Sequence, residues 1–189
     1  MSWTEAIAAG FGLACVVLSA RQSLWCWPTG LIQVALYILV FGRAKLYSDV
    51  GLQAVFVVLQ IYGWWHWLRG GPRQTDDLPV TRLSTGTRLA WIAVAVVGAT
   101  VLGGGMSRWT DAALPYPDAL ITSLSLVSQW LMGRKVWESW VGWIAVDLIA
   151  IPVYASKDLL LTAALYAVFL ALAISGGVAW RRSLATASS

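Results

Sequence analysis

The sequence predicts an all-α integral membrane protein with seven transmembrane helices, built from two parallel three-helix repeats joined by a linker helix. Three observations predict this fold class: a strongly apolar composition, seven long apolar runs, and a match of the chain to itself at one constant offset. Of the 189 residues, 59% are hydrophobic and 12% are charged, and the mean hydropathy is +0.70. Soluble domains carry roughly 25% charged residues, so we expect lipid to surround this protein.

Seven segments are long and apolar enough to span a bilayer, which requires about 20 predominantly apolar residues of helix. The N-terminal segment is expected to be the first span, because it lacks the basic leading region of a signal peptide. The predicted spans cover residues 5–20, 24–42, 47–69, 87–107, 117–133, 137–155 and 158–180.

The basic residues separate to two sides when successive loops are assigned to alternate faces of the membrane. The richer side holds Arg21, Arg69, Arg73, Arg82, Arg88, Arg134, Lys135, Arg181 and Arg182, and the poorer side holds Arg43, Lys45, Arg108 and Lys157. The richer side should be cytoplasmic. We therefore expect a plasma (inner) membrane protein with its N-terminus outside and its C-terminus in the cytoplasm. The basic residues behind the net charge of +4 are scattered over short loops, and their asymmetry indicates membrane orientation, so no nucleic-acid partner is expected.

The first and last three predicted spans match one another at a single constant shift along the chain, here called the repeat offset. This offset places Trp27 on Trp140 and Arg21 on Arg134, and the longest match places Ala54, Val55, Phe56, Leu59, Ile61, Gly63, Trp67 and Arg69 on Ala167, Val168, Phe169, Leu172, Ile174, Gly176, Trp180 and Arg182. One intervening helix gives both halves the same orientation, so the repeat is parallel. The predicted organisation is a first repeat at 1–69, a loop and linker helix at 70–116, a second repeat at 117–182 and a tail at 183–189.

Asp147 is the acidic residue that this topology places deep in the membrane, where ionisable groups are costly and usually functional. It follows Glu138 by nine residues, which puts it about 13 to 14 Å into a hydrocarbon core of about 30 Å. Trp140, Trp143 and Tyr154 share its helix face. Such a face suits a flat cationic ligand, because the rings stack on it and the carboxylate compensates its charge. The alternative is that Asp147 only accepts hydrogen bonds from neighbouring hydroxyl groups.

Uncharged polar residues follow helical spacing in three further spans. Each must find a hydrogen-bonding partner in the membrane, either a neighbouring helix or the hydroxyl and carboxamide groups of a substrate. Both alternatives stay open for every residue of this set. The candidates for substrate contact are Gln33 and Tyr37, Gln53 and Gln60, and Thr122 and Gln129.

No pattern in the sequence indicates catalysis, a metal or a cofactor. His66 is the single histidine, so an H-E-x-x-H zinc pair is excluded, and its predicted position at the membrane surface disfavours a serine–histidine dyad. Cys15 and Cys26 lie in or beside apolar segments and are expected to be packing residues. We therefore predict a protein that is not an enzyme.

Two segments resemble the PnuC family of vitamin transporters. These are WPTGLIQVALYILVFGRAKLYSDVGLQAVFVVLQIYGWWHWL at 27–68 and SLSLVSQWLMGRKVWESWVGWIAVDLIAIPVY at 123–154. The Y-G-W-W and R-K-x-x-E-x-W-x-x-W elements carry the resemblance, which covers nearly the whole chain. It implies a fold of three plus one plus three helices, similar to the SWEET sugar transporters, often assembled as a homotrimer. It also implies transport of nicotinamide riboside by facilitated diffusion, followed by trapping through phosphorylation by a cytoplasmic kinase.

The same resemblance implies roles for individual residues. The W-x-x-W element falls on Trp140 and Trp143, which are then expected to stack on the substrate, and Gln53 and Gln129 occupy family positions that face the same cavity. Where this chain has Asp147, nicotinamide riboside carriers of the family often have an amide. Nicotinamide riboside and thiamine both carry a fixed positive charge, so the carboxylate suits either.

Three hypotheses follow from the sequence. The first is a uniporter for nicotinamide riboside, and the second is a carrier of thiamine or riboflavin from the same family. The third is a membrane scaffold subunit whose polar residues serve only helix packing.

Overall fold

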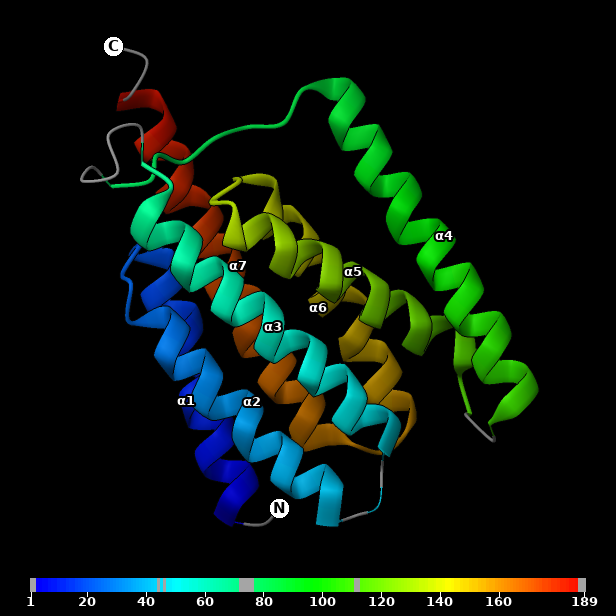
Figure 1. Cartoon of the computed structure of the whole chain (residues 1–189). Coiled ribbons are helices and arrows are strands. Elements are labelled where there is room, and N and C mark those ends of the chain that lie inside the picture. The colour runs from blue at the N-terminus through cyan, green and yellow to red at the C-terminus, as the bar shows by residue number, and fades with distance from the viewer. Residues whose placement is uncertain (1–2, 44, 46, 72–76, 111–112, 187–189) are drawn as a thin grey trace.

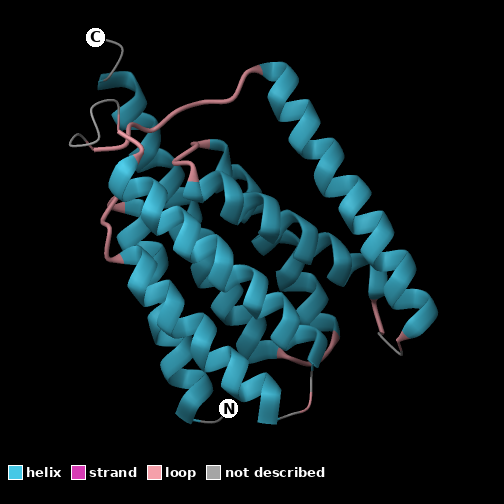
Figure 2. Ribbon diagram, in the orientation of Figure 1, coloured by secondary structure: helices cyan, strands magenta, loops and turns pink. Residues whose placement is uncertain are grey.

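The computed structural model describes residues 3–43, 45, 47–71, 77–110 and 113–186, and it is helical almost throughout these ranges (Figures 1 and 2). The helices are α1 (Trp3–Ala20), α2 (Cys26–Arg43), α3 (Tyr47–Arg69), α4 (Thr85–Trp109), α5 (Pro115–Gly133), α6 (Glu138–Ser156) and α7 (Leu160–Thr186). Each of the seven predicted spans coincides with one of them. The predicted all-helical fold is therefore confirmed.

The largest departure from the predicted boundaries is at the end of α7. The predicted span ends at residue 180, whereas the helix continues to Thr186. Arg181 and Arg182 end the apolar run, but arginine is a good helix former. The helix therefore continues beyond the part that is apolar enough to lie in a membrane.

Five of the helices, α1, α2, α4, α6 and α7, are long and apolar enough to cross a membrane. The chain is therefore a multi-pass membrane protein. Helices α3 and α5 have sufficient length, but they carry more polar side chains, including Gln53 and Gln60 in α3 and Gln129 in α5. These two helices contact one another. Their membrane crossing stays a prediction.

Helix α4 lies along the outside of the other helices and packs on α5 (Figure 1). Its buried residues, Ala95, Ala99 and Gly103, recur every fourth position and let the two backbones approach closely. The Ser123 hydroxyl of α5 donates a hydrogen bond to the Ala95 carbonyl at 2.9 Å. The rest of the α4 surface exposes leucine, isoleucine and valine side chains, as expected for a lipid-facing helix.

Helices α2 and α3 cross where a tryptophan fills the space beside a glycine. The ring of Trp27 is fully buried against Gly63, where even a Cβ atom would overlap it. Trp27 also lies edge-on to Trp67, with ring centroids 5.3 Å apart and an interplanar angle of 84°. The Trp67 Nε1 donates a hydrogen bond to the Met132 carbonyl of α5 at 3.1 Å. Trp67 thus links the first three helices to α5.

The same arrangement recurs at the repeat offset. The ring of Trp140 is buried against Gly176 and lies edge-on to Trp180, with centroids 5.5 Å apart and an interplanar angle of 86°. The Trp180 Nε1 donates to the Ser19 carbonyl of α1 at 3.0 Å. The two acceptor residues, Ser19 and Met132, are themselves related by the repeat offset. Each set of three helices therefore donates one tryptophan hydrogen bond to the first helix of the other set.

The turns between helices recur in the same way. Gln22 and Lys135 have φ values of 56° and 55°, and Lys45 and Asp158 have φ values of 60° and 58°. These four are the non-glycine residues with positive φ in the described part of the chain, and the repeat offset relates the members of each pair. A left-handed backbone is uncommon for such residues, so this pairing supports the match found in the sequence.

Residues 77–84, here called the strap, run across the ends of the helices between α3 and α4. Thr81 pairs with Val136 through two backbone hydrogen bonds, from the Thr81 N–H to the Lys135 carbonyl and from the Trp137 N–H to the Thr81 carbonyl. Leu78 is buried among the tryptophans of the helix crossings. The strap therefore covers the end of the bundle that carries most of the basic residues.

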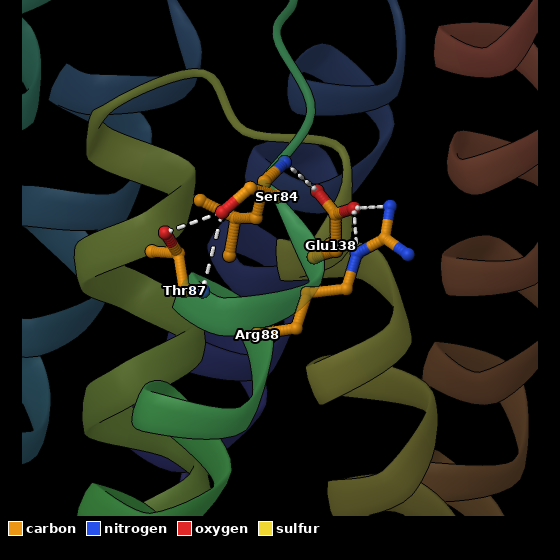
Figure 3. A network of polar contacts seen from close by, with 5 residues as sticks. Ser84, Thr87, Arg88 and Glu138 are labelled. Carbon is orange, nitrogen blue, oxygen red and sulfur yellow. Dashed lines mark hydrogen bonds and ion pairs between the residues drawn. The ribbon is translucent and has the colours of Figure 1, made fainter.

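The strap is fixed to α6 by Glu138 (Figure 3). One carboxylate oxygen accepts a hydrogen bond from the Arg88 Nε at 2.9 Å, and the other accepts from the Leu83 N–H at 3.1 Å. Ser84 caps α4 by accepting a hydrogen bond from the Thr87 N–H at 3.3 Å. Glu138 thus holds both the strap and the first turn of α4.

Gly176→Ala is expected to lower the thermal unfolding midpoint of the purified protein in detergent. The added Cβ would lie 2.5 Å from the buried Trp140 ring, and overpacking of this kind costs about 1 to 3 kcal/mol. Gly10→Ala is the matched control, because nothing lies within 4 Å of its Cβ position. Equal midpoints for the two variants would contradict the packing described here.

Arg88→Glu is expected to loosen the strap, because it places two carboxylates side by side. The Arg88 side chain is 41% exposed and that of Glu138 11%, so solvent screening limits the effect to about 1 kcal/mol. Hydrogen–deuterium exchange of the strap amides should become faster. Arg88→Lys keeps the positive charge and leaves Glu138 free to accept from the Leu83 N–H, so it should keep exchange slow. Unchanged exchange in Arg88→Glu would show that the ion pair does not hold the strap.

Candidate functional site

Asp147 lies near the middle of α6 and is only 3% exposed, so its carboxylate is inside the protein and does not face lipid. Its neighbours in the helix, Val146 and Ala150, belong to an apolar cluster that includes Ile121 of α5. Within the described residues no hydrogen bond reaches the carboxylate. An isolated carboxylate in such surroundings is costly, which makes Asp147 the strongest candidate for a ligand-binding group.

Tyrosines from three helices lie near this region. Tyr154 of α6 stacks on Tyr166 of α7, with ring centroids 5.1 Å apart and an interplanar angle of 27°. Tyr166 lies within electrostatic range of Asp147 and of Tyr37 of α2, and Tyr37 lies within that range of Glu5 of α1. Together the five residues form what we call the tyrosine–carboxylate cluster, to which α1, α2, α6 and α7 all contribute.

The cluster combines residues that the sequence indicated with two that it did not. Tyr37, Asp147 and Tyr154 were candidates from their helical spacing, whereas Tyr166 and Glu5 were missed. A signal for Tyr166 was present, since the repeat offset relates it to Gln53 and thus places it at the equivalent position of a predicted site residue.

The two tryptophans of the W-x-x-W element have different surroundings. Trp140 is 1% exposed and is held between Gly176 and Trp180, and its Nε1 has no hydrogen-bonding partner within the described residues. Trp143 is half-buried and packs against the apolar cluster around Asp147 as well as against the one around Trp140. Of the two rings, Trp143 is therefore the less enclosed one and the one that contacts the surroundings of Asp147.

Gln60 is the predicted polar residue with the clearest unmet hydrogen-bonding capacity. It is 6% exposed and packs beside Gly30 of α2, where a Cβ would overlap its amide group. Its Oε1 has no partner among the residues that the structure describes. A buried acceptor left unpaired costs about 1 to 3 kcal/mol, so Gln60 is suited to accept a hydrogen bond from a ligand.

The other predicted polar residues are distributed over several helices. Gln129 of α5 is buried, and Gln33 of α2 packs against Gly12 of α1. Gln53 of α3 and Thr122 of α5 are half-buried. The contacts described above join neither Gln60 nor these four residues to the tyrosine–carboxylate cluster, so the roles of all five in a site stay predictions.

Helix α6, which carries Trp143 and Asp147, is anchored at both ends. Glu138 holds its beginning, as shown above, and Lys157 directly follows its end. The Lys157 ammonium donates to both oxygens of Asp118 in the first turn of α5, at 2.9 and 2.8 Å. The helix therefore presents its central residues from a fixed frame, as a binding site requires.

A buried lysine adds positive charge at the strap end of the bundle. The Lys135 Nζ lies 4.8 Å from the centroid of the Trp67 ring, a distance suited to a cation–π interaction. Burial lowers the pKa of Lys135, and the nearby Asp77 carboxylate opposes this shift. In the described part of the chain, no group of three or more metal-ligating side chains is present.

Comparisons with known proteins agree with this architecture. The family described as "Nicotinamide mononucleotide transporter" matches residues 2–182. The nicotinamide riboside transporter PnuC of Escherichia coli is 27% identical over an alignment of 207 positions, which covers 97% of this chain and 87% of that protein. The riboflavin/roseoflavin transporter RibM of Streptomyces davaonensis is 29% identical over 182 residues, which span 94% of this chain and 84% of that protein.

A solved structure is also similar. The crystal structure of the vitamin B3 transporter PnuC superposes with a TM-score of 0.77 at 28% sequence identity. The superposition covers 98% of this chain and 83% of that one. The similarity therefore extends over nearly the whole helical bundle.

Proposed function

Because this chain belongs to the nicotinamide mononucleotide transporter family, we propose that it is a membrane transporter that takes up nicotinamide riboside by facilitated diffusion. The observation that carries the choice of cargo is the similarity over nearly the whole chain to transporters named for nicotinamide riboside and vitamin B3. The enclosed carboxylate of Asp147, near tyrosines of α2, α6 and α7, supports a cationic cargo. Nicotinamide riboside combines a flat pyridinium ring of fixed positive charge with a ribose and a carboxamide. Relatives named as transporters also support a function that is not enzymatic.

The electrostatic argument rests on the cost of burying charge. An ion transferred from water into a protein interior is destabilised by several kcal/mol unless an opposite charge compensates it. A bound pyridinium would supply that charge to Asp147, and the aromatic rings would contact its faces. A neutral ligand of the same shape would leave the carboxylate uncompensated.

Within this proposal the residues have separate roles. Trp143 stacks on the ring, Asp147 compensates its charge, and Gln60 accepts a hydrogen bond from the ribose or the carboxamide. The further predicted contacts are Tyr37, Gln53, Gln129 and Tyr154. Ligand contacts by Gln33, Thr122 and Trp140 stay predictions. Trp140 would reach a ligand only if its packing against Gly176 and Trp180 of α7 opened.

We also propose that α1–α3 and α5–α7 are two parallel repeats joined by α4, in a SWEET-like arrangement of three plus one plus three helices. The recurrence of the Trp27 and Trp140 contacts, and of the left-handed turns, supports this proposal. Transporters with such repeats expose a fixed site to one side and then the other by rocking one half against its partner. The proposed boundaries are those that the sequence predicted, with a first repeat at 1–69, a loop and linker helix at 70–116, a second repeat at 117–182 and a tail at 183–189.

The orientation and the assembly are proposals as well. The basic residues at the strap end favour a cytoplasmic C-terminus and an external N-terminus in the plasma (inner) membrane. The family resemblance favours a homotrimer and a cytoplasmic kinase that traps the cargo by phosphorylation.

Riboflavin or thiamine is the second candidate cargo. The relative named as a riboflavin/roseoflavin transporter favours riboflavin. The isoalloxazine ring of riboflavin is uncharged, so Asp147 argues against it, whereas thiamine is a cation and fits the same electrostatic argument.

Uptake into proteoliposomes tests the function directly. Purified protein should accumulate radiolabelled nicotinamide riboside only to the external concentration, and an excess of unlabelled compound should abolish uptake of the label. Preferred uptake of thiamine or riboflavin would transfer the assignment to the second candidate. A protein that is folded but takes up none of the three compounds would favour a scaffold role.

Asp147→Asn is expected to weaken binding of nicotinamide riboside by about tenfold or more, because the bound pyridinium loses the attraction of a nearby carboxylate. Two unit charges about 4 Å apart attract by about 4 kcal/mol at an effective dielectric constant of about 20, and desolvation offsets part of this. The 1,4-dihydro form of the compound has nearly the same shape and no charge, so its affinity should fall much less. Calorimetric titration of both compounds measures the difference. An equal loss for the two would remove charge compensation from the proposal.

Trp143→Ala is expected to weaken binding by about 1 to 3 kcal/mol, the range found when an aromatic ring that stacks on a base is removed. Trp143→Phe keeps an aromatic face and should retain most of the affinity. Trp140→Ala should instead lower the unfolding midpoint, since it empties a fully buried position. Unchanged ligand affinity in Trp143→Ala would exclude this ring from the site.

A further inference from the structure

A hollow of about 560 Å³ lies beside the last turn of α3, away from the tyrosine–carboxylate cluster. Trp65, His66, Arg69 and Gly70 line it. Its volume is in the range of pockets that bind small ligands or head groups. It lies at the strap end of the bundle, where most of the basic residues are.

One wall of the hollow is the end of a stack of side chains that runs between α3 and α5. The Arg134 guanidinium lies 5.9 Å from the centroid of the Trp130 ring. Trp130 stacks on Tyr62, with centroids 4.7 Å apart and an interplanar angle of 8°, and Tyr62 stacks on His66 at 5.7 Å and 7°. The stack therefore connects an arginine of α5 to a histidine that lines the hollow.

Two arginines at or near the hollow have no carboxylate partner within the described residues. Arg69 lines the hollow, and Arg134 belongs to the stack that ends at His66. Arg69 and Arg134 are both exposed, and neither forms an ion pair in the described part of the chain. Arg134 is close enough to His66 to interact with it electrostatically. Guanidinium groups bind phosphate oxygens with two parallel hydrogen bonds, so these surroundings favour a phosphate.

The repeat offers an internal comparison for this hollow. The place equivalent to the stack in the other half of the molecule is a groove of about 310 Å³ between α1 and α7, lined by Val17, Ala20, Arg21, Leu172, Ser175 and Ala179. At the repeat offset Trp130 corresponds to Val17, Tyr62 to Ser175, His66 to Ala179 and Arg134 to Arg21. The equivalent helix crossing forms without an aromatic stack. The stack is therefore not required for the crossing, and its presence on one side only indicates a separate role.

The position of Trp65 indicates the source of the phosphate. Its ring is 53% exposed at the end of a membrane helix, where indole rings favour the boundary between head groups and acyl chains. Basic pockets between helices on the cytoplasmic side bind anionic lipid head groups. We propose that this hollow binds the phosphate of an anionic phospholipid, with Arg69 and Arg134 as its charge partners and Trp65 against the glycerol and the upper acyl chain. This proposal does not depend on the cargo of the transporter.

Native mass spectrometry of the full chain tests the proposal. Protein equilibrated with mixed phosphatidylglycerol and phosphatidylcholine should retain phosphatidylglycerol preferentially. The double variant Arg69→Gln with Arg134→Gln should lose that preference by at least about fivefold, given the attraction of each basic side chain for an anionic surface. Arg21→Gln is the matched control, because Arg21 corresponds to Arg134 at the repeat offset and lines the groove between α1 and α7. This variant should keep the preference for phosphatidylglycerol. Unfolding midpoints show whether each variant is folded, and Trp65→Ala provides an independent change in the same hollow that should also weaken retention.

Three results would overturn the proposal. Retention of phosphatidylglycerol by the double variant would show that Arg69 and Arg134 do not bind the lipid phosphate. An equal loss in Arg21→Gln would show that general charge at the membrane surface is responsible. Displacement of the lipid by millimolar inorganic phosphate would show that the hollow takes a soluble phosphate in place of a lipid.

Discussion

A carboxylate at the middle of a membrane helix must be enclosed by protein, because lipid offers it neither water nor hydrogen-bond donors. Asp147 is enclosed in this way, by an apolar cluster and by Tyr166 of α7. The same constraint explains the distribution of the helices. The two helices with the most polar residues, α3 and α5, contact one another, whereas α4 exposes an apolar surface and packs on α5 with small residues. Because no hydrogen bond from the described residues reaches the enclosed carboxylate, it stays available to a cation.

Tryptophan contacts hold the enclosure together. Trp27 and Trp140 each fill the space beside a glycine, and Trp67 and Trp180 each donate a hydrogen bond to a carbonyl at the end of α5 or α1. These bonds connect the two sets of three helices at the strap end, where Leu78 also packs among the rings. Rocking of one set against the other would act on these contacts.

The sequence was sufficient to predict the helices, because apolar runs of the length of a bilayer define them. It also contained the match between the first three and the last three helices, as one constant offset. The placement of Asp147 inside the protein follows from the cost of exposing it to lipid. The surroundings of single residues could not be predicted in the same way. Periodicity put Trp140 on the face of Asp147, but the residue that determines its packing is Gly176, on another helix. Tyr166 was missed for the same reason: spacing within one helix does not reveal which helix lies opposite.

The central claim is that a cationic vitamin binds beside Asp147, between α2, α6 and α7. A structure of the protein with nicotinamide riboside bound tests it most directly. The account predicts that the pyridinium ring lies against Trp143 with its charge toward the Asp147 carboxylate. Ligand density at another place in the bundle, or a carboxylate that bonds only to protein groups while the ligand is bound elsewhere, would contradict it.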